Sequence, residues 1–265
     1  MTTATDAPAP DGTVPHSPAV HISGLTRVFG HGEDSVVAIA DLNLDVAAGE
    51  FVCLVGASGC GKSTLLNVIA GLDRPSSGVV DSGGRRVSLM FQEGALFPWL
   101  TARQNIELSL RLDGVRDRRA RQNRALQLLE LVQLADVAER RPHELSGGMR
   151  QRVSLARALA QNSSILLMDE PFGALDAMTR DTLHDELELI WERTGVSIIF
   201  VTHNVREAAR LGDRIVVLGS RPGRVISEHR IDISRPRRIE SPEVSALAGV
   251  VTEELRQEVR RHASR

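Results

Sequence analysis

The sequence predicts an α/β layered fold, because short apolar segments typical of strands alternate with segments typical of helices. Four of these segments are almost continuously apolar, which is typical of strands buried on both faces of a parallel sheet. They lie at residues 51–55, 165–168, 197–201 and 214–218. The length of 265 residues suits one large domain or two small ones and allows a substantial core.

Two helices are predicted from apolar residues that recur at helical spacing. Their apolar positions are Leu65, Leu66 and Ile69 in the first helix and Leu183, Leu187 and Ile190 in the second. A glycine that is typical of a helix end follows each pattern, Gly71 after the first and Gly195 after the second. Both helices follow or precede a predicted strand, as a layered α/β domain requires.

The middle of the chain and its two ends depart from this alternation. Residues 102–161 are mostly helical in pattern and rich in arginine, which indicates a helical insert within the α/β domain. The first twenty residues contain many prolines and small residues and predict a disordered tail. A charge-rich extension at the other end finishes in a predicted helix over 243–262. The predicted division is a tail at 1–20, a domain at 21–229 with its helical part at about 94–161, and an extension at 230–265.

Composition argues against nucleic acid as a partner and against a membrane-spanning chain. The formal net charge is −2 and aromatic residues make up 3%, so neither a basic field nor a stacking platform is indicated. No apolar run reaches the length of a spanning helix, and the N-terminal residues lack the pattern of a secretory signal. The two cysteines, Cys53 and Cys60, are expected to be reduced thiols. A role at a membrane would therefore depend on a partner.

The segment GASGCGKST, residues 56–64, fits the phosphate-loop pattern G-x-x-x-x-G-K-[ST] between a predicted strand and a predicted helix. Glycines let backbone N–H groups surround phosphate oxygens, and the helix N-terminus adds partial positive charge. Lys62, the sole lysine of the chain, would reach the β and γ phosphates, and Ser63 would ligate Mg²⁺. A plain glycine-rich turn is the alternative. The predicted nucleotide-binding residues here are Gly56, Ala57, Ser58, Gly59, Cys60, Gly61, Lys62, Ser63 and Thr64.

Two acidic residues follow the apolar segment ILLM at residues 165–168. Asp169 stands where a carboxylate at a strand end would join the Mg²⁺ shell. Glu170 would then polarise an attacking water. Without a phosphate loop in the same chain, two acids here would equally suit the negative charge preferred at a helix start.

The segment LSGGMRQR, residues 145–152, predicts a second helix start that faces an anion. A simple N-cap explains Ser146 but not the two glycines, Gly147 and Gly148, that follow it. One chain thus carries two different phosphate-facing loops. Both loops can face one nucleotide only if two chains pair head to tail.

With these motifs in this order, the sequence resembles the ATP-binding subunit of an ABC transporter over residues from about 21 to 224. Three further matches are the family's Q-loop glutamine, Gln92, its D-loop aspartate, Asp176, and its switch histidine, His203. The resemblance implies a P-loop NTPase (RecA-like) core with a helical subdomain and a small antiparallel β region. It also implies ATP and Mg²⁺ as cofactors and ATP hydrolysis as the activity.

The resemblance assigns roles to these residues. Phe29 would stack on adenine, although a place in the core is the alternative for this side chain. Gln92 would touch Mg²⁺ and report to a transmembrane partner, and His203 would contact the γ-phosphate unless it is an ordinary strand-end histidine. The residues expected to act across a head-to-tail dimer are Ser146, Gly147, Gly148 and Asp176. The chain departs from the pattern in the short interval between Gly78 and Gln92, which leaves little room for the antiparallel region.

The segments FQEGALFPWLTARQNI and IDISRPRR are similar in sequence to segments of the ATP-binding subunits of nitrate, sulfonate and taurine importers. This resemblance implies a small anionic solute, a separate permease, an indirect solute-binding protein and a place on the cytoplasmic face of the membrane. Leu96, Phe97 and Trp99 would dock a helix of the permease or belong to the subdomain core. The alternative function is a soluble ABC ATPase in DNA repair or translation, but the chain has no heptad run and one nucleotide domain. A P-loop kinase would leave the LSGG segment unexplained.

Overall fold

The computed structural model describes residues 17–91, 95–173 and 175–263. In this part of the chain the larger sheet has six strands in the order β5-β6-β7-β3-β8-β9. The four predicted apolar segments are its four central strands, which are parallel to one another. The prediction of a parallel sheet is therefore confirmed. The strands are β3 (Phe51–Gly56), β5 (Val87–Met90), β6 (Ile165–Asp169), β7 (Ser197–Val201), β8 (Arg214–Leu218) and the antiparallel edge strand β9 (Val225–Arg230).

Each central strand is buried on both faces because its alternate side chains enter two different core clusters. In β3, Phe51, Cys53 and Val55 pack with residues from the helical side of the molecule. Val52 and Leu54 of the same strand pack on the opposite face, toward the first helix and the second sheet. This double burial explains why the strand sequences are continuously apolar rather than alternating.

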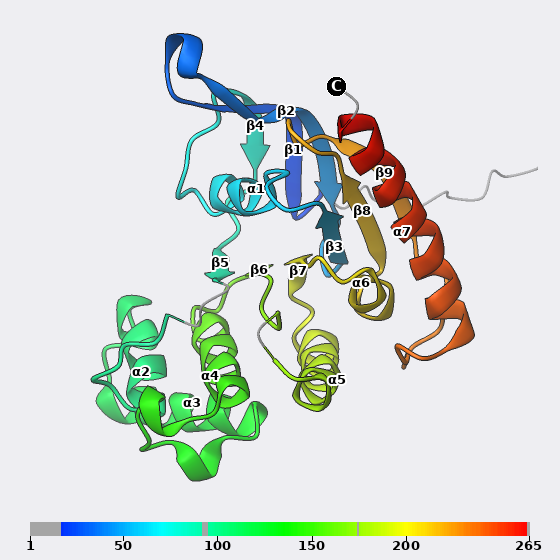
Figure 1. The fold of residues 1–265 in the computed structure, drawn as a ribbon. Coiled ribbons are helices and arrows are strands. Elements are labelled where there is room, and N and C mark those ends of the chain that lie inside the picture. The colour runs from blue at the N-terminus through cyan, green and yellow to red at the C-terminus, as the bar shows by residue number, and fades with distance from the viewer. Residues whose placement is uncertain (1–16, 92–94, 174, 264–265) are drawn as a thin grey trace, which may run out of the picture.

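A second, antiparallel sheet of three described strands has the order β2-β1-β4 and lies at the top of Figure 1. Its strands are β1 (Val20–Phe29), β2 (Val36–Val46) and β4 (Ser77–Asp81). A Cβ atom at Gly78 would lie 2.3 Å from the carbonyl oxygen of Gly24, so only glycine allows β4 to approach β1 this closely. The small antiparallel region is thus present despite the short interval before Gln92.

Helices cover the large sheet and also form a separate group (Figure 1). The group is the predicted helical insert, where α2, α3 and α4 pack together away from the antiparallel sheet. The predicted apolar faces of the first helix and of α5 are buried, and Gly195 ends α5 in a left-handed conformation. The helices are α1 (Lys62–Ile69), α2 (Ala102–Leu112), α3 (Arg118–Leu131), α4 (Gly147–Leu159), α5 (Ala177–Thr194), α6 (Val205–Leu211) and α7 (Pro242–Ala263). Short 3₁₀ turns occupy η1 (Gly32–Asp34), η2 (Ala135–Val137) and η3 (Pro142–Glu144).

The two ends of the described chain pack against the domain. Ala19 and Val20 are fully buried, so β1 begins inside the segment predicted as a tail, while residues 1–16 lie outside the described residues. At the other end, Val244 and Val251 bury one face of α7 in the main core cluster. The division at residues 20 and 229 stays a prediction. No helix in the described part of the chain is long and apolar enough to cross a membrane.

Candidate functional site

The phosphate loop lies between the buried strand β3 and the N-terminus of α1, as predicted. Gly61 caps α1 with a φ of 94°, and a Cβ atom there would lie 2.8 Å from the carbonyl oxygen of Ala38. The packing of the strand end also requires Gly56, where a Cβ atom would lie 2.7 Å from the Cys60 sulfur. These two glycines keep the loop narrow, which is the geometry that lets backbone N–H groups converge on an anion.

Lys62 is the first residue of α1, and its side chain is only 6% exposed. Its Nζ atom donates to the carbonyl oxygens of Gly56 at 2.8 Å and Ala57 at 3.0 Å, and lies 3.7 Å from the Cys60 sulfur. The ammonium group is therefore held inside the curve of the loop, where a compact cation with rotatable donors fits.

Asp169 ends β6, and its carboxylate lies near the hydroxyl of Ser63, the second residue of α1. Burial raises the pKa of Asp169 above its ordinary value, and the charge of Glu170 adds to this, while Ser63 and Lys62 act in the opposite direction. A bound cation would favour the charged carboxylate. The structure thus brings together a hydroxyl oxygen and a carboxylate oxygen, which are the ligands that Mg²⁺ prefers.

No cluster of three or more His, Cys, Asp or Glu side chains that could hold a metal occurs among the described residues. The pair of Ser63 and Asp169 would therefore need phosphate oxygens to complete an octahedral site. Mg²⁺ is commonly bound in this way, by one or two protein ligands together with substrate phosphates and water. The residues present fit the expected cation.

Glu170 and His203 meet at the ends of two neighbouring strands, β6 and β7. The Nδ1 atom of His203 lies 3.1 Å from the Oε2 atom of Glu170. Glu170 adopts a left-handed conformation with a φ of 43°, which costs a non-glycine residue about 1–3 kcal/mol. Its backbone N–H donates to the carbonyl of Val201 at 2.9 Å, which holds this conformation. The side chain of His203 is 65% exposed, so it belongs to an open site rather than to the core.

The segment around Ser146 caps α4 and faces outward. Ser146 accepts a hydrogen bond from the backbone N–H of Met149 at 3.2 Å. Ser146 and Gly147 are exposed, whereas Gly148 is buried. Gly148 packs so closely on α5 that a Cβ atom there would lie 2.5 Å from the Thr179 side chain. No hydrogen bond or ion pair joins residues 146–148 to the phosphate loop within the described chain. This segment is therefore presented outward by the tight packing of α4 on α5.

Asp176 caps the N-terminus of α5 and is exposed. Its carboxylate accepts from the backbone N–H of Thr179 at 3.0 Å and from the hydroxyl of the same residue at 2.7 Å. These hydrogen bonds, first of all the one from the backbone N–H, lower the pKa of Asp176. Asp176 is thus an exposed anion bonded to Thr179, the residue against which Gly148 packs.

The three aromatic residues singled out from the resemblance, Phe29, Phe97 and Trp99, are all exposed. Phe29 at the end of β1 is 41% exposed, and the guanidinium of Arg27 lies 4.3 Å from its ring centroid. Phe29 is therefore not a core residue, which was the alternative for this side chain. Trp99 is 67% exposed and lies 5.5 Å from the ring of Phe97, while Leu96 packs against the core. Gln92 lies outside the described residues.

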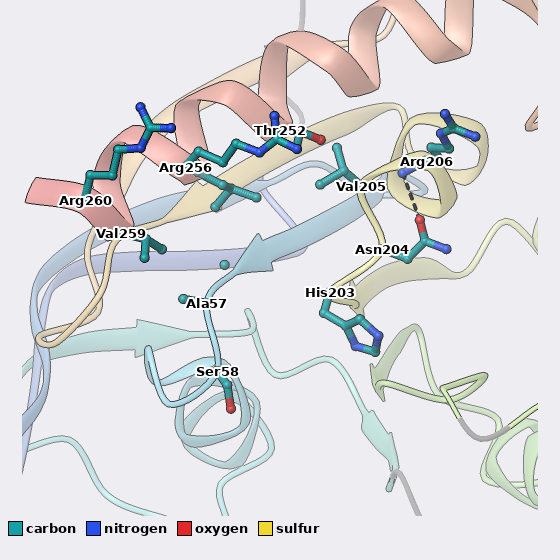
Figure 2. A pocket seen from close by; sticks show the side chains of 12 residues that line it. Ala57, Ser58, His203, Asn204, Val205, Arg206, Thr252, Arg256, Val259 and Arg260 are labelled. Carbon is teal, nitrogen blue, oxygen red and sulfur yellow. Dashed lines mark hydrogen bonds between the residues drawn. The ribbon is translucent and has the colours of Figure 1, made fainter. Parts of the chain in front are cut away.

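A cleft of about 770 Å³ opens beside the phosphate loop (Figure 2). Ala57 and Ser58 form one side of it, His203 lies at another, and Val259 of α7 faces them across the space. Its further lining residues are Gly56, Asn204, Val205, Arg206, Thr252, Leu255, Arg256 and Arg260. The C-terminal extension therefore borders the candidate site, which the sequence did not predict.

The sequence also did not identify the polar residues behind His203. Asn204 caps α6 by accepting from the backbone N–H groups of Arg206 at 3.1 Å and Glu207 at 3.4 Å. Glu207 is buried and bonds His184 of α5. Asn204 stands directly before a helical pattern, so its role as a cap was within reach of the sequence. Nothing in the sequence pairs His184 with Glu207.

Comparisons with known proteins agree with this geometry. Residues 39–173 match the family model described as ABC transporter. The nitrate import ATP-binding protein NrtD of Synechocystis is 48% identical over 81% of this chain and 83% of its own length. The taurine import ATP-binding protein TauB of Rhizobium johnstonii is 45% identical over 85% and 88%. The aliphatic sulfonates import ATP-binding protein SsuB 1 of Mesorhizobium japonicum is 41% identical over 91% and 93%.

The fold agrees with a solved structure as well. A dimeric ATP-binding cassette in a post-hydrolysis state, bound to ADP and Pi, superposes with a TM-score of 0.72 at 35% identity. That match covers 81% of this chain and 100% of the other. The chain therefore belongs to the ABC transporter ATP-binding family and has its P-loop NTPase fold. It is an ABC-type ATP hydrolase.

Proposed function

We propose that this chain powers an ABC importer by hydrolysing ATP between two copies of itself. The observation that carries the proposal is the contact of 3.1 Å between Glu170 and His203, next to the phosphate loop and to the neighbouring side chains of Ser63 and Asp169. The carboxylate of Glu170 would take the proton of an attacking water. His203 would hold that carboxylate in place and contact the γ-phosphate.

The phosphate loop and Lys62 would hold the β and γ phosphates of ATP, and Phe29 would stack on the adenine ring. Mg²⁺, when bound, neutralises phosphate charge, and Ser63, Asp169 and Gln92 would be its ligands. Charge that develops on the phosphates would then meet donors that are already in place, because Lys62 is held by two carbonyl oxygens in the loop.

The residues at 146–148 and Asp176 would act on the nucleotide of a second copy. Ser146, Gly147 and Asp176 are exposed at the face where α4 meets α5, and no hydrogen bond or ion pair among the described residues joins residues 146–148 to the chain's own phosphate loop. A head-to-tail dimer would place this face over the partner's ATP, with the N-terminus of α4 directed at the γ-phosphate. Dimeric solved cassettes of the family support this arrangement.

The transported solute is proposed to be a small anion of the nitrate, sulfonate or taurine class. The support is the identity of 41–48% with subunits named for those substrates. A permease would supply the path through the membrane, and a solute-binding protein would deliver the solute to it. The chain would then work at the cytoplasmic face of the membrane.

The permease would dock on the exposed aromatic pair Phe97 and Trp99, which follow the Q-loop. The two rings lie 5.5 Å apart, and Asn105 holds the loop by bonding the backbone of Phe97. An aromatic anchor of this kind suits an amphipathic helix laid into a groove. Relatives in transport support this function over a role in DNA repair or translation.

The test is to co-purify the chain with a candidate permease and to measure ATP turnover with binding protein loaded with nitrate, taurine or an alkanesulfonate. The proposal expects one of these solutes to stimulate turnover and expects gene deletion to impair growth on that solute. Normal growth on all three, without a second gene of the same type, would remove this substrate class.

A further inference from the structure

A fully buried histidine, His184 of α5, lies behind the catalytic pair. Its Nε2 atom is 2.6 Å from the Oε1 atom of Glu207 on α6. Because a carboxylate oxygen only accepts, the Nε2–H group of His184 is the donor. The Nδ1 atom has no hydrogen-bond partner among the described residues, and the nearest acid, Asp181, is 3.8 Å away. The hydrogen bond to Glu207 therefore sets the orientation of the imidazole ring.

Glu207, held in this way, in turn fixes the segment that carries His203. Glu207 is 4% exposed, and its second carboxylate oxygen accepts from the hydroxyl of Thr202. The same hydroxyl accepts the backbone N–H of Asn204 at 3.0 Å. Both neighbours of His203 in the chain are thus fixed by hydrogen bonds that converge on one buried carboxylate. A buried carboxylate without such donors would be strongly unfavourable, so the arrangement depends on His184.

His184 also contacts the segment that carries Glu170. Its ring meets the edge of the Phe172 ring, with centroids 5.5 Å apart and an interplanar angle of 65°. Phe172 is 2% exposed and follows Glu170 by two residues. One side chain therefore packs against one catalytic segment and hydrogen-bonds, through Glu207, to the other.

A small cavity of about 30 Å³ is lined by residues of both catalytic segments. Its lining includes Glu170 and His203 together with Thr202, Phe172 and Glu207. This volume is sufficient for about one water molecule. A shift of Glu207 would consequently change the geometry of the contact between Glu170 and His203.

We propose that His184 is a positioning residue for ATP hydrolysis: through Glu207 and Phe172 it holds His203 and Glu170 in the geometry that polarises the attacking water. This inference rests on the proposed catalytic roles of Glu170 and His203. It concerns the chemical step and leaves ATP binding to the phosphate loop, which His184 does not touch.

The chain offers a matched control in a second histidine–glutamate pair. His229 of β9 bonds Glu254 of α7 at 2.9 Å, and this pair makes no polar contact with Glu170 or His203. His184→Leu and His229→Leu each remove one imidazole donor from one carboxylate. Both are expected to lower the melting temperature. Only His184→Leu should lower kcat, by about tenfold or more, with the KM for ATP within about threefold of wild type.

A second pair of variants tests the same path by a smaller change. Thr202→Val removes the hydroxyl that bonds Glu207, whereas Thr202→Ser keeps it, so only the valine variant should lose kcat. His184→Gln retains an N–H donor and should recover a substantial part of the activity lost in His184→Leu. If His184→Leu does not fold, the Thr202 pair decides.

The proposal is overturned if His184→Leu and His229→Leu lose kcat equally, or if Thr202→Val hydrolyses ATP like Thr202→Ser. It is also overturned if the His184 variants raise the KM for ATP and leave kcat unchanged. Wild-type turnover in the same assay reports separately on the proposed function. A wild-type chain that does not hydrolyse ATP would contradict the catalytic roles themselves.

Discussion

Replacing Lys62 by arginine preserves the charge and changes the shape, so it tests whether the loop requires an ammonium group. Lys62 is the sole lysine in a chain with 32 basic Lys and Arg residues. Exposed lysines can be exchanged for arginine at little cost, because surface ion pairs contribute only about 0–1 kcal/mol. The side chain of Lys62 is instead 6% exposed and enclosed by the loop.

The expected loss follows from the contacts of Nζ. Its hydrogen bonds to Gly56 at 2.8 Å and Ala57 at 3.0 Å are charge-assisted, and each such bond contributes about 1.5–3 kcal/mol. A guanidinium is planar, is wider and holds its donors in a fixed fork, so it cannot make both bonds in the same space. Overpacking a buried site adds about 1–3 kcal/mol. Loss of one preorganised contact to the transition state typically lowers the rate by about 10²–10³.

The assay is ATP turnover beside a thermal melt of the nucleotide-free protein. Lys62→Arg should lose about two orders of magnitude in turnover and melt several degrees lower, since a protein of this size loses about 2–4 °C per kcal/mol. Arg118→Lys, an exchange at an exposed helix position, is the control and should change neither value. If Lys62→Arg hydrolyses ATP within about threefold of wild type at an unchanged melting temperature, charge alone suffices and the reasoning is wrong.

Three further predictions follow from the site. Burial raises the pKa of Asp169 above its ordinary value of 3.8. The folded state therefore binds the Asp169 proton more tightly than the unfolded state does. The protein consequently loses stability as the pH rises from about 3.8 to the pKa of the folded state. Asp169→Asn should therefore melt higher than wild type near neutral pH, should lose this gain as the pH falls below about 4, and should be inactive. Mixing Ser146→Arg with Lys62→Ala, each inactive alone, should restore one of two sites, as turnover at varied ratios would show. Trp99→Ala should reduce co-purification with the permease while basal turnover stays unchanged, because Trp99 is 67% exposed and outside the catalytic site.

The central fold was predictable because double burial leaves a direct trace in the sequence. The four continuously apolar segments are typical of strands of a covered parallel sheet, and they form its centre. The antiparallel sheet came from the family resemblance alone. β2 nevertheless carries a period of two, with Leu42, Leu44 and Val46 buried between exposed residues, and this signal could have predicted it.

The candidate site was predictable where chemistry is confined to a contiguous motif. The phosphate loop and the strand-end acids are of this kind, since local spacing fixes their positions relative to one another. The buried contacts of His184 with Glu207 and Phe172 join three separate segments, and no local pattern reveals such contacts. The same holds for the cleft wall contributed by α7, which packing brings to the phosphate loop from nearly 200 residues away.

The most direct test of the account is the behaviour of Glu170→Gln with ATP. The variant keeps the size of the side chain and its contact with His203 but cannot take a proton from water. The account predicts that it binds ATP, hydrolyses it very slowly and elutes from a size-exclusion column as a dimer holding two nucleotides. A variant that stays monomeric at high concentration with ATP, or that turns over at a near-normal rate, would contradict the assignment of Glu170 and the shared site between two copies.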